Sequence, residues 1–341
     1  MRVPRAVLRH KPVDLSRVVS YPLARRASKV QLSDMARPLN PAGARAFLDS
    51  LPHQLKAADL GRFITAVSRA RKVGKPVHAM MGAHVIKVGL SPIIIDLMRH
   101  GIVTGVSFSG AGLIHELELA FTGRTSEDVA RGLADGSFGM AKETAIWFSE
   151  ATQLAGERSV GLGRGFGEYI RSRKAPHARL SILAEAARLD LPATAHVAIG
   201  ADIVAQSPHY NAAQIGELSH MDFRLLAAIL GQADTGGAGR VGGAGRTGGV
   251  VLNIGSAVIL PEVFLKALTV ARNLGRGRRA VSGRIVTANF DMIMSYRPRV
   301  NVVERPTALS AGYEFIGHHE IMIPLVAWAL RAACPSRKKS S

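Results

Sequence analysis

The chain has 341 residues, of which 47% are hydrophobic and 20% are charged, a balance typical of a globular protein rather than a disordered one. No apolar run approaches the roughly 20 residues that a membrane-spanning helix needs. A single cysteine, Cys334, excludes a disulfide framework and a cysteine-cluster metal site. We therefore expect a soluble protein, and the cysteine content is compatible with the cytoplasm.

The net charge of +19 lies almost entirely in residues 1–33, 236–248, 271–284 and 331–341. Basic tails and loops are usually solvated or bind polyanions weakly, and no nucleic-acid reading module accompanies this charge. We therefore do not expect sequence-specific binding of nucleic acid. The chain is interpreted as an extended basic arm (1–40), a single α/β domain (41–333) and a basic tail (334–341).

The arm is also Arg-rich and acid-poor, as a mitochondrial transit peptide is. Pro4, Pro12 and Pro22 would interrupt the long amphipathic helix of such a peptide. An arm lying against the body or a neighbouring subunit is the preferred interpretation.

Helices and strands follow one another regularly along the first half of the chain. A helix is expected from Pro41 to about Ser50, and a second over residues 55–73, where apolar residues recur at helical spacing. Two similar units come next, each an apolar run, a turn with glycines and a helix. Their strands are expected at residues 77–81 and 102–108, and their helices at 91–100 and 113–121. Thr125–Asp128 has the acids typical of a further helix start.

The second half of the chain alternates in the same way. Helices are expected at residues 140–155, 181–189, 220–230, 261–273 and 320–333, and strands at 193–198, 250–254, 285–290 and 300–303. Ser159–Gly167 is expected to be a flexible glycine-rich connection. Apolar runs alternating with helices predict an α/β fold, a doubly wound, mostly parallel Rossmann-like sheet flanked by helices. Ligands bind such sheets beyond the carboxyl ends of the strands.

Two glycine-rich motifs do not fit that site. Residues 237–242 (GAGRVG) and 243–248 (GAGRTG) both match the dinucleotide fingerprint GxGxxG. The fingerprint requires a strand before it and a helix after it, whereas here a helix precedes the pair and a strand follows. Residues 234–249 are better interpreted as a low-complexity insertion.

Candidate catalytic residues follow the first two strands. His84 and Lys87 lie on the first turn, and a buried lysine there could form an imine with a carbonyl compound, although a surface lysine on a loop is the more ordinary explanation. His115, Glu116 and Glu118 lie near the start of the next helix, where an imidazole could exchange protons and acids are electrostatically favourable in any protein. The histidines have no metal-ligand spacing, so no metal site is expected.

Other candidates could contact a cofactor. Gly110 and Gly112 would let the backbone approach a phosphate or ribose closely. Asp202 and Asp291 follow strands, where an acid can accept hydrogen bonds from a ribose or an amine, or merely cap a loop.

The order of these segments resembles that of deoxyhypusine synthase and its relatives, including homospermidine synthase. The resemblance covers about residues 75–330 with few identities, and it rests on VIKVGLSPIIIDLMRHGIVTGVSFSGAGLIHELELA, SILAEAARLDLPATAHVAIGAD, VVLNIGSAV, NFDMIMSY and EIMIPLVAWAL. It implies a Rossmann-like domain that binds NAD at subunit interfaces of a homo-oligomer, a tetramer or dimer. The implied cofactor-binding residues are Gly89, Ser91, Ser109, Gly110, Gly112, Asp202, Gly255, Ser256 and Asp291.

Two residues that carry the family's reaction are missing. Residues 296–312 contain arginines but no lysine, and Leu260, Pro261 and Glu262 stand where the family has its catalytic histidine. Arginine cannot replace lysine as an imine-forming nucleophile, because it stays protonated. The acceptor of a transferred group is therefore expected to be a free amine.

These observations lead to two functional hypotheses. The first is an NAD-dependent enzyme acting on a polyamine or related amine, with crevice acids holding the cationic substrate. The second is a non-catalytic nucleotide-binding or interaction protein on the same fold, whose basic tails bind a polyanion.

Overall fold

Six strands form one parallel sheet within the computed structural model, which describes residues 15–40, 42–235, 248–275, 283–308 and 310–334. The strand order is β3-β2-β1-β4-β5-β6, and every neighbouring pair is parallel. The strands are β1 (Val77–Met81), β2 (Gly105–Ser109), β3 (Ala193–His196), β4 (Val250–Ile254), β5 (Val286–Asp291) and β6 (Gly312–Ile316). This arrangement confirms the predicted doubly wound α/β fold. The strand order reverses between β1 and β4.

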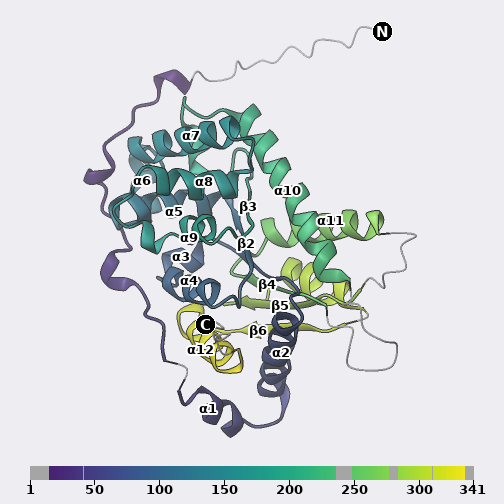
Figure 1. Ribbon diagram of the computed structural model, residues 1–341. Coiled ribbons are helices and arrows are strands. Elements are labelled where there is room, and N and C mark those ends of the chain that lie inside the picture. Colours follow the sequence, from purple (N-terminus) through teal and green to yellow (C-terminus); the bar gives the residue numbers. More distant parts are fainter. Residues whose placement is uncertain (1–14, 41, 236–247, 276–282, 309, 335–341) are drawn as a thin grey trace, which may run out of the picture.

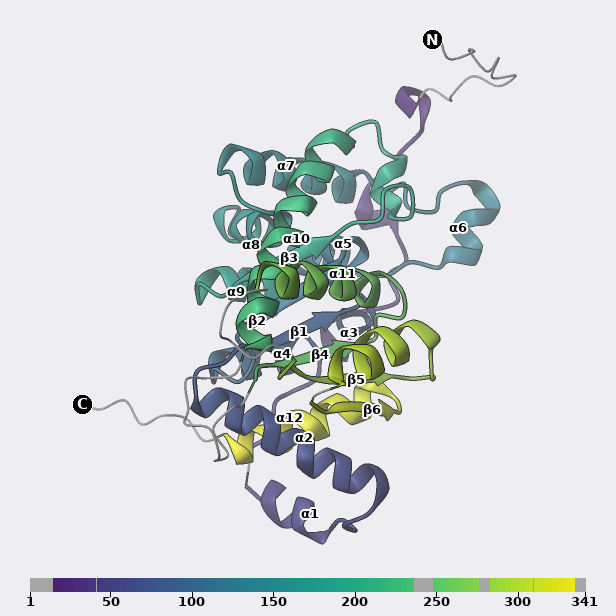
Figure 2. The same ribbon diagram turned by 90° about the vertical axis from the view of Figure 1, so that its right-hand side faces the viewer.

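Helices cover both faces of the sheet (Figures 1 and 2). One face packs against α2 (Leu55–Lys72), α4 (Ser91–Arg99), α5 (Gly110–Thr122), α8 (Leu162–Ser172), α9 (Ile182–Arg188) and α12 (His319–Ala333). The other face packs against α10 (Ala212–Asp234), α11 (Ile259–Leu274) and the π-helix η6 (Pro298–Glu304). The remaining α-helices of the described chain are α1 (Ala44–Ser50), α3 (His84–Lys87), α6 (Val129–Asp135) and α7 (Lys142–Glu157).

The alternation of side chains along each strand explains how these two faces differ. Apolar residues such as Val106 and Phe108 face the larger core, whereas polar residues point toward α10 and α11. Buried polar groups require hydrogen-bond partners. Here the register supplies them across β1, β2 and β3, because His78 Nε2 lies 2.7 Å from Ser107 Oγ, which lies 2.6 Å from Thr194 Oγ1.

The predicted strand at residues 300–303 is wrong. These residues belong to η6, and the sixth strand is Gly312–Ile316 instead. A short run of three valines and Asn301 does not distinguish a buried helical turn from a buried strand, and Val300 and Val302 are buried here.

The predicted flexible connection at Ser159–Gly167 is also wrong, because α8 begins at Leu162. Its glycines bring the helix against its neighbours: a Cβ at Gly163 would lie 2.5 Å from the backbone of Ala193, and one at Gly167 would lie 2.2 Å from Leu183 O. Close helix packing, rather than chain flexibility, therefore accounts for these glycines.

Residues 15–40, called the N-terminal arm below, run along one side of the molecule from α7 to α1 (Figure 1). Backbone hydrogen bonds join Tyr21 to Met140 and Lys142, Val30 to Thr125, and Ala36 to Gly89. Among the described helices, none combines the length and apolar character needed to cross a membrane. Residues 236–247 of the glycine-rich insertion lie outside the described chain, as do residues 1–14 and 335–341.

Candidate functional site

A cavity of about 160 Å³ lies between the N-terminal arm, α3, α5 and the loop after β3. Its polar lining consists of Arg26, Lys87, His115, Glu118, Ser126, Glu127 and Asp202. α5 follows β2 directly and Asp202 follows β3, so the cavity lies at the carboxyl ends of these strands, as expected for a parallel sheet. The structure thus brings together four residues that the sequence singled out.

Asp202 fills the start of α5. A Cβ at Gly110 would lie 1.9 Å from Asp202 Oδ2, and this oxygen also accepts a hydrogen bond from Ala198 N at 3.3 Å. Burial raises the pKa of Asp202, although hydrogen bonds from the backbone of Ala198 and Ala111 oppose the shift. The glycine at position 110 therefore makes room for this carboxylate, and a phosphate at the same helix start would meet a negative charge.

Glu118 lies at the centre of a buried hydrogen-bond cluster. Arg26 donates to both of its oxygens, at 2.8 and 2.7 Å, and Thr125 and Thr144 donate at 2.6 and 2.8 Å. Burial alone would raise the pKa of Glu118, but the hydrogen bonds and charge of Arg26 outweigh it and lower the pKa. Glu118 is therefore an ionised carboxylate with its lone pairs occupied.

The same cluster determines the tautomer of His115. Thr125 donates its one hydroxyl hydrogen to Glu118, so it can only accept from His115 Nδ1, which lies 2.6 Å from Thr125 Oγ1. Burial lowers the pKa of His115 to about 4, so the ring is neutral near pH 7. His115 therefore carries its hydrogen on Nδ1 and a lone pair on Nε2.

Lys87 links this cavity to a second group of residues. Burial and the charges of His319 and Lys87 lower the pKa of His84, and the charge of Lys87 also contributes to the low pKa of His115. His84 Nδ1 lies 2.9 Å from His319 Nδ1, and His319 Nε2 lies 3.0 Å from the carbonyl oxygen of Phe290. Lys87 is exposed, lines the cavity and shares the short helix α3 with His84.

Three predicted cofactor-binding residues lie at the ends of β4 and β5. Gly255 turns the chain with a φ of +63°, and Ser256 Oγ accepts a hydrogen bond from Leu260 N at 3.3 Å. Asp291 is 7% exposed, and its Oδ2 has no hydrogen-bond partner within the described residues. A buried carboxylate oxygen without a partner is suited to accept from a hydroxyl group such as those of a ribose.

Glu116, Gly89 and Gly112 have contacts that explain them without a ligand. Glu116 is fully buried and accepts from Ser181 Oγ, Ile182 N and Leu183 N at the start of α9; burial raises its pKa to about 7. A Cβ at Gly89 would lie 2.3 Å from Asp34 O in the arm, and one at Gly112 would lie 2.5 Å from the Phe108 ring. Ser91 is fully buried in the first turn of α4, and its Oγ has no hydrogen-bond partner within the described residues. Ser109 precedes α5 as its N-cap residue, without a capping hydrogen bond from its side chain.

Arg26 and Glu127 are lining residues that the sequence did not reveal. Arg26 is 92 positions from Glu118, and no local pattern signals that an arm residue enters the cavity. Glu127 was noticed only as part of a helix start, whereas its Oε1 accepts from Gly139 N at 3.2 Å and its carboxylate faces the cavity.

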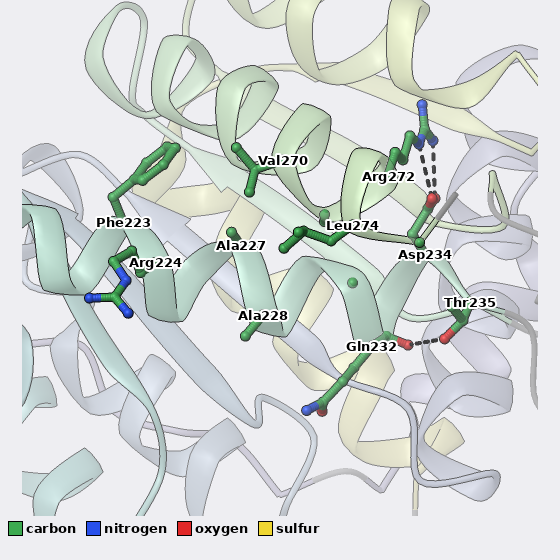
Figure 3. A pocket seen from close by; sticks show the side chains of 13 residues that line it. Phe223, Arg224, Ala227, Ala228, Gln232, Asp234, Thr235, Val270, Arg272 and Leu274 are labelled. Atoms are coloured by element: carbon green, nitrogen blue, oxygen red, sulfur yellow. Dashed lines mark hydrogen bonds and ion pairs between the residues drawn. The ribbon is translucent and has the colours of Figure 1, made fainter. Parts of the chain in front are cut away.

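A larger hollow of about 570 Å³ lies elsewhere, between α10 and α11 (Figure 3). Its floor is mostly apolar, with Ala227, Val270 and Leu274, and its acid, Asp234, is paired with Arg272. Asp234 also accepts from Gly283 N just before β5, so this hollow reaches the amino ends of the strands. It holds none of the predicted residues and lies at the end of the sheet where ligands are not expected.

No family model matches the chain, and no curated protein sequence matches it. Its similarity to solved structures is one of fold. A LOR/SDH protein from Methanococcus maripaludis S2 has a TM-score of 0.50 at 12% identity, with 81% of this chain and 68% of that chain covered. A protein of Entamoeba histolytica described as a deoxyhypusine synthase has a TM-score of 0.46 at 10% identity, with 89% and 99% covered.

AgrE in its ternary complex with ornithine and NAD+ has a TM-score of 0.45 at 12% identity. The match covers 81% of this chain and 32% of AgrE, so this chain spans about a third of that protein. The likeness to the LOR/SDH protein is one of α/β architecture. The AgrE structure contains NAD+.

The chemistry of the cavity follows from its own side chains. Asp202, Glu127 and Glu118 contribute carboxylates, Arg26 is already bound to Glu118, and His115 offers a free lone pair. Apolar walls come from Ile114, Val129 and Phe138. Such a cavity can hold a small cation with an apolar stem, because a charged group is buried favourably only beside opposite charges and hydrogen-bond partners.

Proposed function

We propose that this chain is an NAD-dependent enzyme that acts on a small organic amine, such as a polyamine or a related compound. The observation that carries the proposal is the cavity at the ends of β2 and β3, where two carboxylates and a neutral histidine converge. Glu127 and Asp202 would hold the ammonium group, and His115 Nε2 would accept one of its hydrogen bonds. The volume of about 160 Å³ lies below the roughly 300–1,000 Å³ of drug-sized pockets, which supports a small substrate.

The ends of β4 and β5 are the part of the crevice that suits the cofactor. Gly255 and Ser256 would lie beside it, and Asp291 Oδ2 would accept a ribose hydroxyl hydrogen. NAD, when bound, would accept hydride from the carbon that bears the amine. An ammonium must first lose a proton, and Asp202, whose pKa is raised by burial, would take it.

The test uses calorimetry and absorbance on the full chain and three variants. Wild type is expected to bind NAD, and addition of spermidine, putrescine or ornithine is expected to produce NADH absorbance. Asp291→Asn should weaken NAD binding, whereas Asp202→Asn should leave NAD binding unchanged and reduce NADH formation by about tenfold or more. Glu217→Gln, at an exposed position on α10, is the control and should match wild type.

Two outcomes would contradict the proposal. Absence of NAD binding would remove the cofactor, and the non-catalytic interaction protein would then be the better hypothesis. NAD binding without NADH from any of these amines would retain a nucleotide site and remove the amine chemistry.

A further inference from the structure

Arg26 is a buried cation supplied by the N-terminal arm rather than by the α/β body. The residue is 7% exposed, and both of its terminal nitrogens donate to Glu118 at 2.8 and 2.7 Å. The arm is tied down on either side of Arg26, since Tyr21 pairs with Ala141 and Val30 pairs with Thr125. The guanidinium is therefore held in a defined position against α5.

Thr125 is the link from this ion pair to the cavity. It lies on the loop between α5 and α6, it is fully buried, and its hydroxyl bridges Glu118 Oε2 and His115 Nδ1, each at 2.6 Å. The direction of these bonds is not free. Glu118 accepts only, so the hydroxyl hydrogen points to Glu118 and the imidazole must donate to the hydroxyl oxygen.

We infer that Arg26 is a positioning residue, which acts through Glu118 and Thr125 to hold His115 as the Nδ1–H tautomer with Nε2 open to a substrate amine. This inference rests on the proposed function for the identity of the substrate, but the tautomer itself can be measured without any substrate. Arginine suits the role because its planar fork binds both oxygens of a carboxylate at once, which a lysine ammonium cannot do.

Thr144 provides a matched control within the same cluster. Its hydroxyl donates to Glu118 Oε1 at 2.8 Å. Thr144 is 2% exposed and Thr125 is fully buried, so the two positions are similar in burial. Thr144 has no hydrogen bond to His115. Thr144→Val therefore removes a hydrogen bond to Glu118 and leaves the link to the imidazole. Thr125→Val removes the link, and Thr125→Ser restores the hydroxyl.

The experiment reads the tautomer of His115 from its ring nitrogen-15 shifts by NMR in the full chain. Wild type, Thr125→Ser and Thr144→Val should all show the Nδ1–H form. Thr125→Val should shift the ring toward the Nε2–H form or toward a mixture of the two tautomers. Arg26→Lys should shift the tautomer equilibrium in the same direction or broaden the ring nitrogen resonances. Retention of a pure Nδ1–H form in both Thr125→Val and Arg26→Lys would overturn the inference, and so would an equal change in Thr144→Val.

Amine binding then separates this inference from the proposed function. If both hold, calorimetry should show that Thr125→Val weakens amine binding by about tenfold or more, because an acceptor for a charged group is lost, while Thr144→Val changes it little. If the tautomer responds as expected and no amine binds even to wild type, the positioning role stands and the proposed substrate is wrong.

Discussion

Asp202 and Gly110 show how a single side chain determines what the crevice can bind. The carboxylate occupies the space beside the first residue of α5, so the helix start interacts with an acid of the chain itself. An anionic ligand is disfavoured there and a cationic one is favoured. This residue pair is therefore the reason to look for an amine rather than a phosphate in this part of the crevice.

Substitution of Gly110 tests that arrangement. In Gly110→Ala the new Cβ would lie 1.9 Å from Asp202 Oδ2, so the carboxylate must move away from the helix start. We expect the free energy of unfolding, measured with a chemical denaturant, to fall by about 1–3 kcal/mol. The control is Gly216→Ala on α10, where nothing lies within 4 Å, and it should be neutral or stabilising by about 0.5–1 kcal/mol. Equal stability of Gly110→Ala and wild type would show that Asp202 is not held there.

At the scale of helices and strands, the sequence predicted most of the sheet. Five of the six strands have long enough apolar runs, bounded by glycine or proline, to be recognised and approximately located. The strand predicted at residues 300–303 was wrong because a short run of three valines and Asn301 suits a buried π-helix equally well. β6 was missed because it is an edge strand in which Glu314 is partly exposed and Ile316 is exposed, so its hydrophobic pattern is weak.

The candidate site was predictable only in part, for a related reason. Lys87, His115, Glu118 and Asp202 could be found because they follow strands, and the ends of parallel strands meet in space. Arg26 could not be found, because its partner is 92 positions away and Arg26 lies on an arm whose 3-10 helices, Leu15–Arg17, Leu23–Arg25 and Leu32–Asp34, are each three residues long. The tautomer of His115 depends on that arm and on Thr125, so it too required the three-dimensional structure.

Asp222 connects three elements, and it predicts how stability depends on pH. From α10, its Oδ2 accepts from Gly163 N of α8 at 2.9 Å and from Ala195 N of β3 at 2.7 Å. Burial raises the pKa of Asp222 to about 7, against the effect of these hydrogen bonds. The folded chain thus holds this proton more tightly than the unfolded chain, whose aspartate pKa is about 3.9.

The sign of the effect follows from that difference. A raised folded-state pKa contributes stability that is fully present below about pH 4 and is lost as the pH rises to about 7. We expect Asp222→Asn to remove up to about 4 kcal/mol of this pH dependence, because asparagine does not titrate. The measurement is the free energy of unfolding at several values between about pH 4 and pH 8. If the free energy of unfolding of Asp222→Asn depended on pH in the same way as that of wild type, Asp222 would not be the source of this pH dependence.

At the scale of the whole molecule, exposed apolar side chains gather near the carboxyl ends of β5 and β6. Gly317 N donates to Asp291 O at 2.9 Å, so the loops that leave these two strands begin side by side. The apolar patch consists of Met292, Ile293, Met294, Tyr296, Ile316 and Ile321, each between 41% and 69% exposed. Exposed apolar surface of this kind marks a site of interaction, and the patch borders Asp291, whose Oδ2 has no hydrogen-bond partner within the described residues.

We expect a second copy of the chain to cover this patch. The patch is apolar and exposed, and it lies beside the residues proposed to hold the cofactor. Sedimentation velocity should show a concentration-dependent dimer or tetramer for wild type, and Ile293→Asp should shift it to the monomer. Leu274→Asp is the matched control, because Leu274 is 70% exposed but lies at the hollow between α10 and α11. Monomeric wild type at all concentrations would contradict the expectation, and dissociation by Leu274→Asp alone would indicate an interface at α10 and α11 instead.

If the patch is the interface, Ile293→Asp should also weaken NAD binding while Leu274→Asp should not, because only Ile293→Asp removes a subunit from the neighbourhood of Asp291.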